Sequence, residues 1–113
     1  MRARLSEIVV DCHEPAKLVR FWAALLVTEP VDREPTWSYV DPPGAPRIAF
    51  QAVPEPKAGK NRLHLDIEVD DLATATEEAV ALGATRSGGP VRDEYGPFQV
   101  MLDPEGNEFC LIA

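Results

Sequence analysis

Three polar side chains in this sequence lie in segments rich in apolar residues. Glu7 begins the run that continues through Ile8, and a carboxylate placed there needs an arginine, a histidine or a bound cation as its partner. His64 and Asp66 alternate with leucines, so the two-residue period of a strand puts both on one face. We expect Asp66 either to pair with Arg62 or to orient the His64 imidazole.

Two aromatic residues, Trp37 and Tyr39, also share one face of a short segment. Aromatic rings on a pocket wall suit planar ligands, and small-molecule pockets are mostly apolar with a few placed polar groups. The sequence contains no Ser/His/Asp arrangement, phosphate-binding loop or CxxC motif. The pattern therefore favours a pocket for an aromatic molecule over hydrolytic, nucleotide or redox chemistry.

The elements that must position these residues occur in an order that repeats. The first half predicts a strand over 5–12, a helix of about 12 residues from Pro15, and short strands between prolines from 28 to 53. A polar connector at 54–60 separates the halves. The second half predicts a strand over 63–69, a helix over 72–82 stopped by Gly83, and short segments around Thr85, at 98–102 and at 107–112.

The two halves align as a duplicated βαβββ unit. Glu7 aligns with His64 at an offset of 57 residues, and Phe50-Gln51 aligns with Phe109-Cys110 at an offset of 59. Phe50 and Phe109 have the opposite parity to Gln51 and Cys110, so we expect the two phenylalanines to pack under the helices.

Length and charge exclude several classes of protein. The 113 residues suit one domain, with module one at about 1–56 and module two at about 60–113. The longest apolar stretch, 21–27, is too short to span a membrane. A net charge of −8 argues against nucleic acid as a partner. With no export signal at the N-terminus, we expect a cytoplasmic protein whose Cys12 and Cys110 are free thiols.

Three short sequence motifs resemble those of a known family. They are Pro15–Trp22, Lys60–Ile67 and Asp103–Cys110, and with the repeated βαβββ order they resemble the glyoxalase-like branch of the vicinal-oxygen-chelate superfamily. That superfamily includes glyoxalase I, bleomycin-resistance proteins and extradiol dioxygenases. The resemblance implies an α+β fold of two tandem βαβββ modules, which form a curled mixed sheet, an open cup, with helices outside. It also implies a ligand in the cup and a homodimer.

The resemblance further implies a set of metal ligands. Metal-dependent members take one ligand from the first and one from the last strand of each module, which here are Glu7, Gln51, His64 and Cys110. Such a set could hold zinc. Cys110 stands where those members usually carry the glutamate that also serves as general base, so we do not expect strict glyoxalase I activity.

Two functions remain open at this point. The first is a binding protein, serving sequestration or resistance, whose cup holds an aromatic or polycyclic small molecule without a required metal. The second is a divalent-metal-dependent lyase, isomerase or epimerase, with no catalytic residue assigned. The expected ligand-contacting residues are Glu7, Trp37, Tyr39, Gln51, His64, Asp66 and Cys110. The sequence leaves open whether one chain or a dimer builds the cup.

Overall fold

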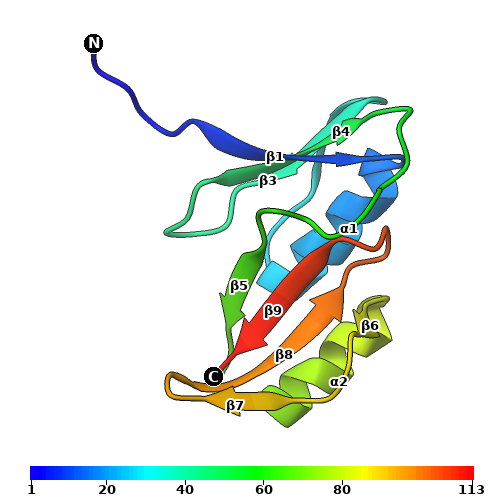
Figure 1. Cartoon of the computed structure of the whole chain (residues 1–113). Coiled ribbons are helices and arrows are strands. Elements are labelled where there is room, and N and C mark those ends of the chain that lie inside the picture. Colours follow the sequence, from blue (N-terminus) through cyan, green and yellow to red (C-terminus); the bar gives the residue numbers. More distant parts are fainter. The chain divides into compact units, whose positions relative to one another are not determined.

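Each half of the chain forms one helix and one mixed sheet (Figure 1). The computed structural model describes residues 1–113 and divides into unit 1, Met1–Pro56, and unit 2, Lys57–Ala113. Unit 1 contains β1 (Glu7–Cys12), α1 (Pro15–Leu26), β2 (Val31–Glu34), β3 (Trp37–Val40) and β4 (Arg47–Ala52). Unit 2 contains β5 (Leu65–Glu68), α2 (Leu72–Leu82), β6 (Thr85–Arg86), β7 (Val91–Asp93), β8 (Gly96–Leu102) and β9 (Glu108–Ile112).

The two sheets have the same topology. The strand order is β1-β4-β3-β2 in unit 1 and β5-β9-β8-β6 in unit 2, where β7 also pairs with β8. In each unit the first strand runs parallel to the last, and the other pairs are antiparallel. The predicted α+β fold with a repeated element order is therefore confirmed.

Unit 2 has one strand more than the sequence pattern predicted. The segment after α2 pairs with β8 twice, first through β6 and then through β7. Between them the chain leaves the sheet at Gly88, which has a positive φ of 77°. Pro90 follows and lacks the N–H that a ladder needs. Because of this short break, a prediction based on hydrophobic runs did not detect β7.

One face of each sheet is buried against the helix of the same unit. Phe50 in β4 and Phe109 in β9 are 0% and 1% exposed, so the predicted parity of the two phenylalanines is confirmed. Helix α1 contacts β3 and β4, and α2 contacts β6, β8 and β9. The helix of each unit does not cover the opposite face of its sheet, and that face carries the residues that the sequence singled out.

Helix α1 begins as its local sequence dictates, and it ends at a residue that is strained. Pro15 occupies the first helical turn, where a missing N–H costs nothing, and Glu14 makes no side-chain cap bond. The helix ends at Val27, which takes a left-handed conformation with φ 52° and is 87% exposed. It is the one non-glycine residue with positive φ in the chain. A β-branched side chain is strained in that conformation.

Replacing Val27 by glycine should therefore stabilise the protein. Glycine adopts positive φ without steric cost, and the gain should be about 1 kcal/mol in the free energy of unfolding. Urea denaturation measures it. The matched control is Val31→Gly, an exposed valine in extended β2, which should destabilise the protein. A loss of stability in Val27→Gly would contradict the prediction.

The turn between β8 and β9 is built on a buried carboxylate. Asp103 is 2% exposed, and its Oδ1 accepts hydrogen bonds from the backbone N–H groups of Glu105 and Asn107 at 2.9 and 3.0 Å. Gly106 completes the turn with a φ of 85°. These bonds set where β9 begins, and so which β9 residue faces which residue of β8.

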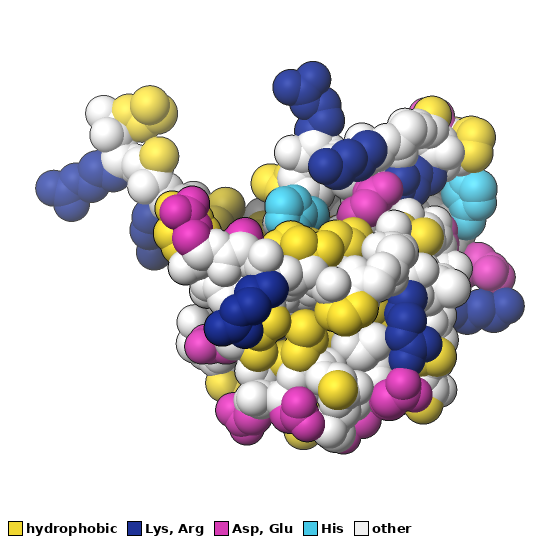
Figure 2. All heavy atoms as spheres, turned by 60° about the horizontal axis from the view of Figure 1, so that its bottom comes forward, with side chains coloured by type: hydrophobic (Ala, Val, Ile, Leu, Met, Phe, Trp, Pro, Cys, Tyr) yellow, Lys and Arg dark blue, Asp and Glu magenta, His cyan; other side chains and the backbone are white.

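Large apolar side chains remain exposed in unit 2, namely Leu63, Leu82, Val91 and Tyr95. Figure 2 shows apolar side chains gathered in the middle of one face with charged side chains around them. The predicted homodimer would cover apolar surface of this kind, and it stays a prediction. Neither helix has the length and apolar character needed to cross a bilayer.

Candidate functional site

Strand register in unit 2 places three of the predicted residues side by side. Asp66 in β5 lies opposite Cys110 in β9, and Cys110 lies opposite Val100 in β8. His64 comes two residues before Asp66, just ahead of the first residue of β5. All four side chains lie on the sheet face turned away from α2, because side chains alternate along each strand.

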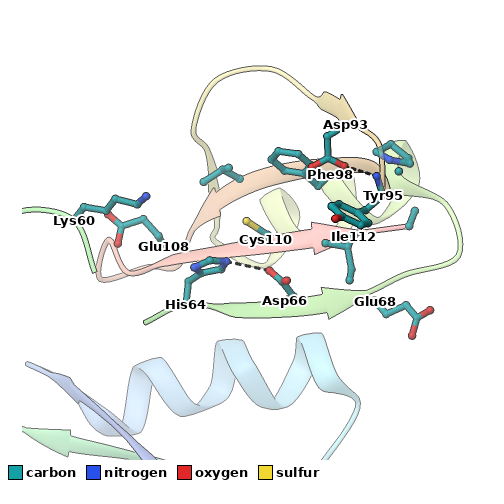
Figure 3. A pocket seen from close by; sticks show the side chains of 14 residues that line it. Lys60, His64, Asp66, Glu68, Asp93, Tyr95, Phe98, Glu108, Cys110 and Ile112 are labelled. Atoms are coloured by element: carbon teal, nitrogen blue, oxygen red, sulfur yellow. Dashed lines mark hydrogen bonds and ion pairs between the residues drawn. The ribbon is translucent and has the colours of Figure 1, made fainter. Parts of the chain in front are cut away.

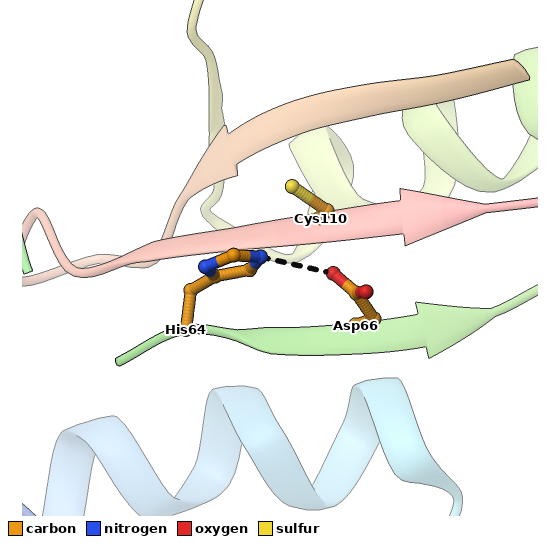
Figure 4. A group of neighbouring side chains, drawn as sticks. All are labelled: His64, Asp66 and Cys110. Carbon is orange, nitrogen blue, oxygen red and sulfur yellow. Dashed lines mark ion pairs between the residues drawn. The ribbon is translucent and has the colours of Figure 1, made fainter. Parts of the chain in front are cut away.

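His64, Asp66 and Cys110 lie close together, and His64 and Asp66 point toward one another (Figure 4). The His64 Nε2 lies 3.2 Å from the Asp66 Oδ1, and the three potential ligand atoms all lie within 4.8 Å of one another. Of the two partners expected for Asp66, His64 is the one that it contacts. Both side chains are about half exposed, so the cluster is open to small molecules from solvent.

The cluster forms part of the wall of a cavity of about 710 Å³, which we call the unit 2 cavity. That volume is in the range of small-molecule sites. Figure 3 shows Lys60 and Glu108 toward one end, the cluster in the middle, and Tyr95 and Phe98 toward the other end. The apolar part of the lining is made by Tyr95, Gly96, Pro97, Phe98, Val100, Ile112 and Ala113.

The thiol of Cys110 is held in its neutral form. Burial raises its pKa above the ordinary value, the nearby Asp66 carboxylate raises it further, and Lys60 acts in the opposite direction. Both larger effects disfavour the thiolate. The metal-free cluster is therefore poorly suited to nucleophilic catalysis, although a cysteine, a histidine and an aspartate lie together.

Glu108 fixes the segment that leads into His64. Its side-chain oxygens accept hydrogen bonds from the Asn61 backbone N–H and from the Lys57 Nζ, each at 2.9 Å. The first of these bonds, helped by the second, lowers the pKa of Glu108 below its ordinary value of 4.5. This carboxylate is thus an anchor between β9 and the connector, placed beside the cavity.

Acid should weaken this anchor. A carboxylate with a lowered pKa in the folded state stabilises the fold above its unfolded pKa, and this contribution is lost as the pH falls below about 4.5. Glu108→Gln should therefore lower stability at neutral pH and flatten the decline of stability between about pH 5 and pH 3. Urea denaturation at several pH values measures the slope. Glu78→Gln, on the exposed side of α2, is the control, and an unchanged slope in Glu108→Gln would contradict the prediction.

In unit 1, the carboxylate of Glu7 has an arginine as its neighbour. Glu7 in β1 lies opposite Arg47 in β4. Arg47 donates two hydrogen bonds to Asp41, at 2.8 and 3.0 Å. These bonds, with smaller contributions from Tyr39 and Glu7, raise the pKa of Arg47. Of the three partners expected for Glu7, the structure of unit 1 supplies the arginine.

The aromatic pair of unit 1 is covered by guanidinium groups. Trp37 and Tyr39 share one face of β3, as predicted, since both lie opposite odd-numbered residues of β4. The Arg47 guanidinium lies 3.8 Å from the centre of the Tyr39 ring, and Arg33 lies 5.4 Å from both ring centres. A planar ligand would have to displace these cations, so stacking on Trp37 and Tyr39 stays a prediction.

The register corrects the predicted pairing between the units. Glu7 and its partner Arg47 are 40 residues apart, whereas Leu65 and its partner Phe109 are 44 apart. If Glu7 corresponds to His64, then Cys110 corresponds to Ala49 and not to Gln51. The predicted offsets of 57 and 59 residues differ by two, whereas the two ladders require offsets that differ by four. The two predicted offsets therefore cannot both hold.

The cavity contains residues that the sequence interpretation missed. Tyr95, Phe98, Lys60 and Glu108 all line it. Alternation could have found Glu108, which shares the parity of Cys110. Lys60 belongs to a segment whose composition predicts only a solvated connector. Tyr95 sits in the turn between β7 and β8, and only the pairing of these strands brings it over the cavity.

A divalent ion, which the resemblance implies, fits the cluster in unit 2. The donor set is one imidazole nitrogen, one carboxylate oxygen and one sulfur. Zinc sites use these ligand types, and a site with three protein ligands leaves one position for water or substrate. Of the four ligands implied by the resemblance, His64 and Cys110 belong to this cluster and Asp66 is added to it. Glu7 and Gln51 lie in unit 1.

Comparison with known proteins identifies relatives along nearly the whole chain. The family model described as "Glyoxalase-like domain" matches residues 7–112. No curated protein matches this chain.

Solved structures share its fold at low sequence identity. An enzyme of the glyoxalase/bleomycin resistance protein/dioxygenase family from Burkholderia phytofirmans superposes with a TM-score of 0.83 at 24% identity, covering 96% of this chain and 97% of its own. A mutant of the fosfomycin resistance protein FosX from Listeria monocytogenes, complexed with Mn(II) and a dihydroxypropylphosphonic acid, has a TM-score of 0.80 at 18% identity and covers 100% and 91%. FosX from Mesorhizobium loti has a TM-score of 0.75 at 18% identity and covers 98% and 92%.

Proposed function

The chain belongs to the glyoxalase-like domain family of the vicinal-oxygen-chelate superfamily, and on that premise we propose that its unit 2 cavity binds a small organic molecule with an aromatic or polycyclic part. The observation that carries this proposal is the division of the cavity wall into an apolar end and a polar middle. Binding of this kind serves sequestration or resistance, and it requires no metal.

The apolar end suits a ring system. Phe98 in β8 lies opposite Ile112 in β9, and both face the cavity. Tyr95 projects from the turn next to them and is 88% exposed, so an entering ring would bury surface that the free protein leaves in water. Aromatic contacts of this type add about 0.5–1.5 kcal/mol beyond the burial of area.

The polar middle suits a hydroxyl, carbonyl or amine on the ligand. His64 and Asp66 offer a donor and an acceptor at half-exposed positions, and the neutral Cys110 thiol lies beside them. Polar groups so placed fix the orientation of a ligand whose affinity comes from its apolar part.

An NMR titration with two probes tests the proposal. We expect 1-naphthol to shift the backbone amide signals of Phe98, Val100 and Cys110, and the saturated analogue decahydro-1-naphthol to bind less tightly. Tyr95→Ala should weaken 1-naphthol binding about fivefold, or about 1 kcal/mol. Val91→Ala, on the same hairpin but outside the cavity wall, should leave it unchanged. Equal affinity for both probes, or shifts elsewhere only, would refute the proposal.

The convergence of His64, Asp66 and Cys110 favours a second function, that of a divalent-metal-dependent lyase, isomerase or epimerase. A bound ion would act as a Lewis acid toward a substrate carbonyl or similar oxygen. The residues of this chain would hold the ion at the polar middle and the organic part of the substrate at the apolar end. Elemental analysis of protein purified without added metal tests this function. Stoichiometric zinc, nickel, iron or manganese that His64→Ala removes would support it, and protein free of metal after dialysis against each ion would refute it.

A further inference from the structure

We infer that Cys110, His64 and Asp66 form a three-ligand site of thiolate, imidazole and carboxylate in unit 2 that prefers zinc-like ions to manganese and magnesium. This inference rests on the second function proposed above, and it adds Asp66 to two of the four ligands that the family resemblance implies. It concerns which residues hold the ion and which ion they select.

The backbone brings the three ligands together without any rearrangement. Asp66 and Cys110 are direct neighbours across the parallel β5–β9 ladder, and adjacent strands of a sheet lie about 4.7–4.9 Å apart. His64 reaches the same point from two residues earlier. The β5–β9 ladder is continuous from Leu65 to Glu68, so two of the three ligands stand on regular strands.

The distances suit a single tetrahedral ion. Bonds of about 2.0–2.3 Å to zinc put neighbouring ligand atoms about 3.3–3.8 Å apart. The His64 Nε2 and Asp66 Oδ1 already have a separation of 3.2 Å, and all three ligand atoms lie within 4.8 Å. A movement of the Cys110 Sγ by up to about one ångström would close the set. The half-exposed side then leaves the fourth position toward the cavity.

The charge around the site favours a cation. Lys60 is the one lysine or arginine in the cavity wall, which also contains the carboxylates of Asp66, Glu68, Asp93 and Glu108. A wall with this excess of negative charge raises the local concentration of cations. A thiolate and one carboxylate would balance the two charges of the ion.

The sulfur decides which ion is selected. Thiolate ligands favour zinc and related ions, whereas manganese and magnesium favour carboxylate, carbonyl and water oxygens. Cys110 stands where the resemblance expects a glutamate, so this chain exchanges a hard oxygen for a soft sulfur. The FosX structure from Listeria contains Mn(II), and the present site should discriminate against that ion.

Titration of the reduced, metal-free full chain with Co²⁺, Zn²⁺ and Mn²⁺ tests the inference. We expect a thiolate-to-cobalt charge-transfer band in the near ultraviolet, and zinc binding at least about 100-fold tighter than manganese binding in calorimetry. Cys110→Ser should abolish the band, and Asp66→Ala should weaken zinc binding at least about tenfold. Cys12→Ser is the matched thiol control and should keep the band.

A second variant keeps the test valid if Cys110→Ser proves unstable. Cys110→Glu restores a carboxylate and should narrow the preference for zinc over manganese by at least about tenfold. Manganese bound as tightly as zinc by the unmodified chain, with no thiolate band, would overturn this inference and leave the metal-dependent function standing. A band that depends on Cys12 would overturn it as well. Failure to bind any ion would overturn both this inference and the metal-dependent function. The results with metal ions do not bear on the proposal that the cavity binds 1-naphthol.

Discussion

Phe109→Ala should lower the free energy of unfolding by about 3–5 kcal/mol. Phe109 is 1% exposed and lies in β9, where it pairs with Leu65 of β5 on one side and Met101 of β8 on the other. Truncation leaves a cavity between the sheet and α2 that the surrounding strands cannot fill. Since the free energy of unfolding of native proteins is about 5–15 kcal/mol in total, the variant should be close to unfolding at about 37 °C.

The urea concentration at the midpoint of unfolding measures the effect, provided that the slope of the unfolding free energy against urea concentration stays constant. A second phenylalanine provides the comparison. Phe98 lies on the opposite sheet face, is half-buried and lines the unit 2 cavity. Phe98→Ala should cost much less stability than Phe109→Ala but should weaken 1-naphthol binding, as Tyr95→Ala does. If the two substitutions destabilised the protein equally, the assignment of β8 and β9 faces would be wrong.

The second large effect concerns the reactivity of Cys110 in the metal-free protein. Burial and the Asp66 carboxylate raise the pKa of the thiol, and Lys60 opposes them. Because alkylation requires the thiolate, iodoacetamide should modify Cys110 severalfold more slowly than it modifies glutathione at about pH 7.5. Asp66→Asn should accelerate the reaction, since it removes a neighbouring negative charge. Lys60→Gln should slow it.

Mass spectrometry with a chelator present separates this reaction from that of Cys12, which is 4% exposed and reports only on opening of unit 1. The two charge variants should converge toward the unmodified chain at high salt, because salt screens charge interactions while the effect of burial persists. Identical rates in Asp66→Asn and Lys60→Gln at low salt would show that neither charge acts on the thiol.

Local patterns in the sequence predicted the elements of this fold. Pro15 and the apolar stripe from Leu18 to Trp22 define α1, and Gly83 marks the end of α2. Alternation assigned Phe50 and Phe109 to the helix face, because the two-residue period is a property of any strand and needs no knowledge of its neighbours. The same period placed His64 and Asp66 together on the other face.

The composition of the site, in contrast, depends on contacts that no local pattern contains. The contact of Asp66 with Cys110 depends on the register between β5 and β9, whose paired residues are 44 positions apart in the sequence. Tyr95 reaches the cavity because β7 pairs with β8. Side-chain alternation is set by each strand's own geometry, whereas register follows from long-range packing. The sequence by itself therefore determined which face each residue occupies, and the tertiary structure decided which residues meet there.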